Sequence, residues 1–289
     1  MLSGLLVNGV IIPLVLGIAV ALVLAIVAKP RMEIGCLLTG LAILAAYVSL
    51  EGVPPFPPGA VKQKLAYAFL ASAVLVSIAA SAPRWRRHLL AGLVGGFAPA
   101  FLLWFAGPIL ARAADFGAVF APLAYTVLAG LAALLLLFAN GSNDAPAAPR
   151  ALVRLSAVLA YCIGSAVVAA IGGFIGMGQM FGALAALTGG LVLVGYVAIL
   201  RGNSALPARL DSIVPALLLP VLATGILVAF YTTSLDAVAH TLLPLTLIVG
   251  IALVRSGRLD RLPGAIGPIA QGAALALPVL LSITIAVLP

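Results

Sequence analysis

The sequence predicts an all-α fold, a polytopic membrane helix bundle of about ten transmembrane helices with both termini on the outer, non-cytoplasmic side. Three observations support this prediction: the apolar composition, the length of the apolar runs, and the position of the basic residues between them. Of the 289 residues, 64% are hydrophobic and 8% are charged, and the mean hydropathy is +1.31. A soluble domain cannot bury that much apolar surface, so we expect lipid to solvate much of it.

Ten continuous apolar runs divide the chain, each about 17 to 25 residues long. About 20 apolar residues span a bilayer as a helix, so each run is long enough for one crossing. The runs are continuous rather than alternating, which favours helices over the strands of a membrane barrel. They cover residues 5–28, 34–50, 65–83, 89–111, 116–139, 155–175, 180–200, 212–234, 238–254 and 264–288.

The basic residues are unevenly distributed among the gaps between these runs. Twelve of the 15 Lys and Arg residues follow odd-numbered runs, and three lie in the remaining gaps. Because basic loops stay on the cytoplasmic side, this bias predicts five hairpins facing the cytoplasm and both chain ends outside. The twelve are Lys29, Arg31, Arg84, Arg86, Arg87, Arg150, Arg154, Arg201, Arg209, Arg255, Arg258 and Arg261; the three are Lys62, Lys64 and Arg112.

The net charge of +8 falls on the predicted inner side, because acidic and basic residues balance on the predicted outer side. Contact with anionic lipid headgroups explains this distribution better than contact with nucleic acid. The partner we expect is therefore the lipid bilayer, and we expect no nucleic acid. The abundance of Ala, Leu, Val and Gly and the short loops favour a bacterial protein of the inner (cytoplasmic) membrane.

The loop at residues 140–150 divides the chain into two candidate halves, 1–139 and 151–289. Each half holds five runs, and this odd number would give the halves opposite orientations, as in transporters built from inverted repeats. We find no residue-level similarity between the halves. No tail or loop is long enough to form a soluble domain, so residues 1–289 are predicted to be a single integral membrane domain.

The loop at residues 51–64 is rich in proline. Four prolines surround Phe56, and proline both fixes the φ angle and lacks an amide donor, so we expect an extended rather than helical segment. One interpretation is a stiff cap whose Phe56 dips into the membrane interface. The other is a docking loop for a partner subunit, or a lid over an outer cavity. The residues concerned are Pro54, Pro55, Phe56, Pro57 and Pro58.

No motif for catalysis, cofactor binding or metal binding stands out. The ten runs contain no Asp, Glu, Lys or Arg, and no HExxH, GxSxG or Walker A pattern occurs. Cys36 and Cys162 lie singly in apolar runs, and neither His88 nor His240 has a second histidine one helical turn away. We therefore expect no cofactor, no metal and no enzymatic activity.

Glycines four residues apart occur at Gly92 and Gly96, within the fourth run, and at Gly172 and Gly176, at the end of the sixth. Small residues at this spacing let helix backbones approach closely. The pattern indicates either tight packing within the bundle or a seam for a second copy or another membrane protein.

Three prolines fall near mid-depth by residue count: Pro99, Pro220 and Pro278. A proline inside a helix removes a backbone hydrogen bond, and bent helices at the membrane midplane often surround a binding site. We expect kinks at these positions, formed either for packing alone or around a site.

Polar residues gather at two predicted outer turns. They could form the rim of an outward-facing pocket for a neutral polar molecule, or an ordinary solvated loop with a helix cap. This candidate outer rim comprises Gln179, Tyr231, Thr232, Thr233, Asp236 and His240.

Two functions are compatible with these patterns. The first is a facilitator or carrier for a small neutral or amphiphilic solute, which would work by movement of proline-kinked helices. The alternative is a non-catalytic accessory subunit that packs against a larger membrane complex through its glycine faces and its proline-rich loop.

Overall fold

The computed structural model describes residues 6–26, 32–82, 84–110, 116–139, 147–231, 237–256 and 266–288, and the statements below concern these ranges. Every regular element within them is helical. In chain order they are η1 (Val7–Ile11, a π-helical turn), α2 (Ile12–Ile26), α3 (Met32–Glu51), α4 (Val61–Ser81), α5 (Arg86–Leu110), α6 (Phe116–Leu137), α7 (Ala147–Ile171), α8 (Ile175–Leu200), α9 (Ala205–Asp211), α10 (Val214–Tyr231), α11 (Ala237–Leu242), α12 (Leu245–Ser256) and α13 (Ile266–Val287).

Within the described ranges, ten helical segments are long and apolar enough to cross a membrane, as the ten apolar runs predict. Seven of them are single helices. The other three combine η1 with α2, α9 with α10, and α11 with α12. The ten apolar helices fit a multi-pass membrane protein, and the fold class predicted from the sequence is confirmed to that extent.

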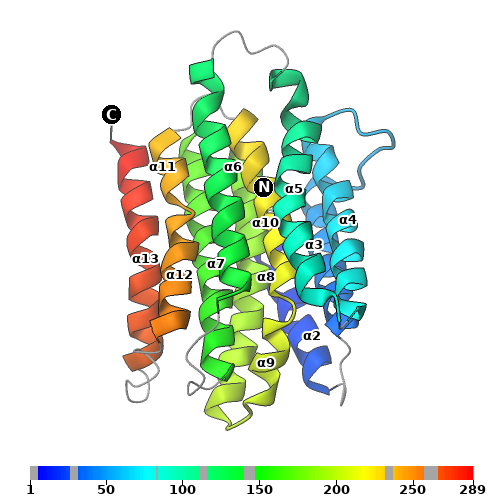
Figure 1. Ribbon diagram of the computed structural model, residues 1–289, viewed down its shortest axis with the longest axis vertical. Helices are drawn as coiled ribbons and strands as arrows, with labels where there is room; N and C mark the ends of the chain where they lie inside the picture. The colour runs from blue at the N-terminus through cyan, green and yellow to red at the C-terminus, as the bar shows by residue number, and fades with distance from the viewer. Residues whose placement is uncertain are drawn as a thin grey trace.

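The helices stand side by side along the longest axis of the molecule (Figure 1). We call the end that holds α9 the basic end, because Arg201, Arg209 and Arg255 lie at helix ends there. The opposite, far end carries the loop at residues 52–60. Within the described ranges the ten long helical segments run alternately between the two ends, and α13 finishes at the far end (Figure 1).

Helix α10 lies at the centre of the bundle. Every residue from Val214 to Val228 is buried, and α10 packs against α3, α4, α5, α6, α7 and α8. A helix that is apolar on all sides needs apolar neighbours on all sides, which explains its central position. Since α10 belongs to the second half of the sequence and α3–α6 to the first, the two halves interlock in one bundle.

Short turns separate α9 from α10 and α11 from α12. Pro215 lies in the first turn of α10, and Pro244 immediately precedes α12, at positions where the missing amide hydrogen of proline is tolerated. The Thr246 amide donates to the Leu243 carbonyl at 3.0 Å and closes the second turn. Hydropathy does not reveal this break, because the residues at 243 and 244 are themselves apolar.

The closest helix crossings use glycines outside the two predicted pairs. A Cβ atom at Gly190 of α8 would lie 2.6 Å from the carbonyl oxygen of Leu14 in α2, so only glycine allows this approach. By contrast, Gly92 and Gly96 are exposed with no atom within 4 Å of a Cβ position.

The other predicted glycine pair also lacks a tight contact at one of its members. A Cβ at Gly176 would meet only the Glu51 Oε1 atom, at 3.7 Å. Gly172 is buried. The interpretation as tight intramolecular contacts is therefore wrong for Gly92, Gly96 and Gly176, because spacing alone does not say which face of a helix meets a neighbour.

The proline-rich loop is held in place by its own polar contacts. The Tyr67 hydroxyl donates to the Pro55 carbonyl at 2.8 Å, and Lys62 pairs with Glu51 at 2.5 Å. Phe56 is 87% exposed, with only the edge of its ring near Tyr67. These contacts hold the loop against α3 and α4 and leave Phe56 exposed, which is compatible with either predicted role, a stiff cap or a docking loop.

Candidate functional site

The residues predicted to form the outer rim do not share one surface. His240 is only 2% exposed and lies inside the bundle. Tyr231 is partly buried and donates its hydroxyl hydrogen to the Phe105 carbonyl at 2.5 Å, while Gln179 is partly buried on α8. Thr232, Thr233 and Asp236 lie outside the described residues.

The three predicted kink prolines occupy different environments. Pro220 is buried in the central helix α10, and Pro278 is buried in α13. Pro99 is exposed on the outer surface of α5. Only Pro220 and Pro278 can therefore face a site within the bundle.

A buried polar cluster lies where α6, α7, α10 and α11 meet. The Tyr125 ring of α6 stacks on the imidazole of His240 in α11, with centroids 4.1 Å apart. The Tyr125 hydroxyl forms a hydrogen bond with the Tyr161 hydroxyl of α7. Both tyrosines are fully buried. The stack and the hydroxyl pair thus join three helices that are far apart in the sequence.

The backbone of α10 provides the fourth wall of the cluster at Gly225. A Cβ there would approach the Tyr125 ring to 2.9 Å and the Tyr161 hydroxyl to 3.1 Å. Any side chain at this position would displace the two tyrosines. Glycine at 225 is therefore what lets the hydroxyl pair lie directly against the central helix.

The register of α7 against α12 adds Thr246 to the cluster. Gly250 faces Ala157, and Leu243 faces Gly164 on the antiparallel partner. The same register places Thr246 level with Tyr161. Ser165 follows Tyr161 by one turn of α7 and so lies on the same face.

Several polar atoms of this cluster are buried without a hydrogen bond of normal geometry. They are the Ser165 Oγ, both ring nitrogens of His240 and the Thr246 Oγ1. A buried polar atom left unsatisfied destabilises the fold by about 1–3 kcal/mol, so natural proteins retain few of them without a functional reason. We call Tyr125, Tyr161, Ser165, His240 and Thr246 the polar cluster; it offers neutral donors and acceptors to water or to a neutral polar group.

The sequence analysis did not single out most of the polar cluster. Tyr125 and Tyr161 count as apolar in a hydropathy profile, yet both fall well inside their runs, away from the interface where tyrosine is enriched. A buried tyrosine hydroxyl needs a partner, so tyrosines in the interior of a run are a usable signal for a polar contact between helices.

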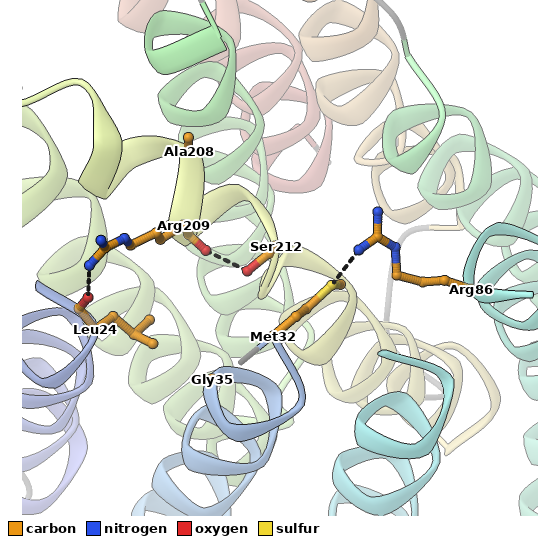
Figure 2. A pocket seen from close by; sticks show the side chains of 7 residues that line it. All are labelled: Leu24, Met32, Gly35, Arg86, Ala208, Arg209 and Ser212. Carbon is orange, nitrogen blue, oxygen red and sulfur yellow. Dashed lines mark hydrogen bonds between the residues drawn. The ribbon is translucent and has the colours of Figure 1, made fainter. Parts of the chain in front are cut away.

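A second feature is a cavity at the basic end. It consists of two adjoining pockets of about 400 and 270 Å³ that share Met32, Arg86, Ala208 and Ser212 in their linings. Figure 2 shows the smaller pocket, with Arg86 reaching in from α5 and Arg209 held by α9 on the opposite side. Together the two pockets include four arginines, Arg86, Arg87, Arg154 and Arg209, and we call them the arginine cavity.

Helix α10 connects the two features. Val214 and Pro215 line the arginine cavity, and Gly225 borders the polar cluster, ten residues or about 15 Å further along the helix. The residues between them, including Pro220, are buried, and all of them except Thr224 are apolar. Buried side chains of α10 therefore lie between the cavity and the cluster.

Comparisons of the chain with protein-family models, curated proteins and solved structures found no match. The residues that the structure describes hold no group of three or more His, Cys, Asp or Glu side chains able to bind a metal ion.

Proposed function

We propose that this chain is a carrier for a small neutral or amphiphilic solute in the cytoplasmic membrane of a bacterium, with the basic end inside and both termini outside. The observation that supports the proposal best is the polar cluster. Its buried, uncharged hydrogen-bonding atoms lie inside an otherwise apolar bundle, against one face of the central helix at Gly225. Polar residues in that position are costly and usually mark a solute or ion pathway.

The broken helices support a mechanism of movement. Interrupted helices near the membrane interior are a common feature of carriers, because the breaks allow one part of the bundle to rock against another. Here one break precedes α10, whose Gly225 borders the polar cluster. The other lies between α11, which carries His240, and α12, which carries Thr246. A shift of α10 about its break and Pro220 would open the cluster toward the arginine cavity.

We expect purified protein in phosphatidylcholine vesicles to accelerate uptake of at least one of a panel of radiolabelled polyols, amides and nucleosides above empty vesicles. The variant His240→Gln should reduce that uptake by about tenfold or more, because an oriented hydrogen-bonding group is lost from the site. Tyr161→Phe should lower it as well, since the hydroxyl pair is broken.

The matched control is Tyr196→Phe, which removes a hydroxyl from a partly exposed tyrosine of α8. Its uptake should equal that of the unmodified chain. Uptake equal to that of empty vesicles for every solute in the panel would exclude this carrier proposal.

A second candidate function is that of an accessory subunit in a membrane complex. The exposed face of α5 carries Gly92, Gly95 and Gly96 with no atom within 4 Å of their Cβ positions. Such a smooth surface allows a foreign helix to pack closely. Absence of uptake together with a copurifying membrane protein would favour this candidate, and the α5 surface would then be the first contact to test.

A further inference from the structure

We propose that the arginine cavity binds a phosphate group, and this proposal does not depend on the carrier function. The lining includes four arginines and a single carboxylate, that of Asp211, among the residues that the structure describes. Guanidinium groups donate paired hydrogen bonds whose geometry matches phosphate oxygens. A concave site with this charge excess is therefore suited to an oxyanion.

Two of the four arginines are engaged in holding the protein together. Arg154 donates to Asp211 at 2.6 Å and also to the Ala139 carbonyl. Arg209 donates to the Leu24 carbonyl at 2.8 Å, as Figure 2 shows. These contacts join α7 to α9 and α9 to α2, and so fix the walls of the cavity.

The other two arginines have weak partners. Among the residues that the structure describes, Arg86 reaches only the Met32 sulfur, at 3.6 Å, and Arg87 lies 5.4 Å from the centre of the Phe138 ring. Neither is in an ion pair within the described part of the chain. A thioether and an aromatic face are poor substitutes for an oxyanion, so both guanidinium groups keep most of their donors available.

The position of Arg86 and Arg87 strengthens the case. Both lie in the first turn of α5, a helix of 25 residues that has no acidic residue in that turn. A helix N-terminus carries partial positive charge, which repels these two cations and attracts an anion. A bound phosphate would relieve the repulsion and use the helix terminus and both side chains together.

The remaining lining indicates the source of the phosphate. Leu90, Leu137, Phe138, Val214 and Pro215 form an apolar wall of the larger pocket. An apolar wall beside a cationic one suits an amphiphile, with a phosphate at one end and acyl carbons at the other. The phosphate could also come from the free ion, and the experiment below separates the two sources.

The test uses the full chain in phosphatidylcholine nanodiscs at constant ionic strength. One arm titrates inorganic phosphate against chloride and measures thermal stabilisation. The other adds dioleoyl-phosphatidylglycerol to the nanodisc and measures lipid retained by the protein in native mass spectrometry. Stabilisation by inorganic phosphate assigns the site to the free ion, and retention of phosphatidylglycerol without such stabilisation assigns it to a lipid headgroup.

The double variant Arg86→Gln, Arg87→Gln should weaken binding of the active probe by about tenfold or more, because charge-assisted hydrogen bonds are lost. The double variant Arg86→Lys, Arg87→Lys keeps the charge without the paired donors. Its binding should be intermediate between that of the unmodified chain and that of the glutamine double variant. The matched control, Arg201→Gln with Arg255→Gln, removes two exposed arginines from the same end outside the cavity. It should change binding by less than about twofold.

Three results would overturn the proposal. One is that neither inorganic phosphate nor phosphatidylglycerol binds the unmodified chain. Another is an equal loss of binding in the cavity variant and in the control, which would indicate diffuse attraction to the basic end. The third is unchanged binding in Arg86→Gln, Arg87→Gln.

Discussion

Gly190→Leu is expected to destabilise the bundle by about 3 kcal/mol or more, the upper range for overpacking. A Cβ at this position would lie 2.6 Å from the Leu14 carbonyl oxygen and 2.9 Å from the Ile18 amide nitrogen. Both are backbone atoms, so no side-chain rotation can relieve the overlap and α2 must move away from α8. The measurement is the apparent melting temperature of the purified protein in a fixed detergent.

The matched control for this prediction is Gly92→Leu, which adds the same side chain to an exposed glycine with open space around it. Its melting temperature should stay close to that of the unmodified chain. Equal melting temperatures for Gly190→Leu and Gly92→Leu would show that α2 and α8 do not cross closely at Gly190.

Breaking the Arg154–Asp211 ion pair is expected to have the second-largest effect. The two side chains are 14% and 31% exposed, and each would lose its only charged partner within the described residues. Removing one member leaves a half-buried charge, so Arg154→Met and Asp211→Leu should each destabilise the fold by about 2 kcal/mol. The double variant should be less destabilised than the sum of the two, with a coupling of about 1 kcal/mol or more in a double-mutant cycle.

The Lys62–Glu51 pair provides the comparison, because Lys62 is 48% exposed. Exposed pairs typically contribute less than about 1 kcal/mol, so a parallel cycle on these two residues should give the smaller coupling. A coupling near zero for Arg154 and Asp211 would contradict the geometry at the break between α9 and α10.

Hydropathy predicted the ten long apolar helices well, because an apolar run of sufficient length has few alternatives to a buried or membrane-spanning helix. It could not predict which helix is central. The runs that become α10 and α6 are similarly apolar, and only the fold shows that α10 is enclosed. The break between α11 and α12 was hidden for a related reason, since one proline among apolar residues changes the mean hydropathy of the run 238–254 very little.

Glycine spacing was a poor guide to the contacts between helices. The pair at Gly92 and Gly96 faces outward, whereas the closest crossing joins Gly17 to the segment around Gly190, in helices remote from each other in sequence. Gly17 and Gly190 each have another small residue four positions away, a spacing that also allows close helix contact. Ala21 lies four residues after Gly17, and Ala186 lies four residues before Gly190. The pattern finds surfaces that can pack closely, and the partner is decided by the whole bundle.

The candidate site was predicted only in part. His240 was singled out as polar, but its position near the end of a run suggested a rim, because counting residues cannot show that its side chain is buried against Tyr125. The alternation of basic residues assigned Arg86, Arg87, Arg154 and Arg209 to one side, and the structure brings these four arginines together at one end of the bundle. Their convergence on a cavity could not be predicted, since it depends on how α5, α7 and α9 pack around the start of α10.

The central claim is that the chain crosses the membrane ten times with its basic end in the cytoplasm. The most direct test is labelling of single cysteines in intact cells with a membrane-impermeant maleimide, in a chain whose buried Cys36 and Cys162 are replaced by alanine. Val53→Cys, at a position 82% exposed in the far-end loop, should label at once, and Arg201→Cys should label only after the membrane is permeabilised. Immediate labelling of Arg201→Cys, or protection of Val53→Cys, would contradict the account.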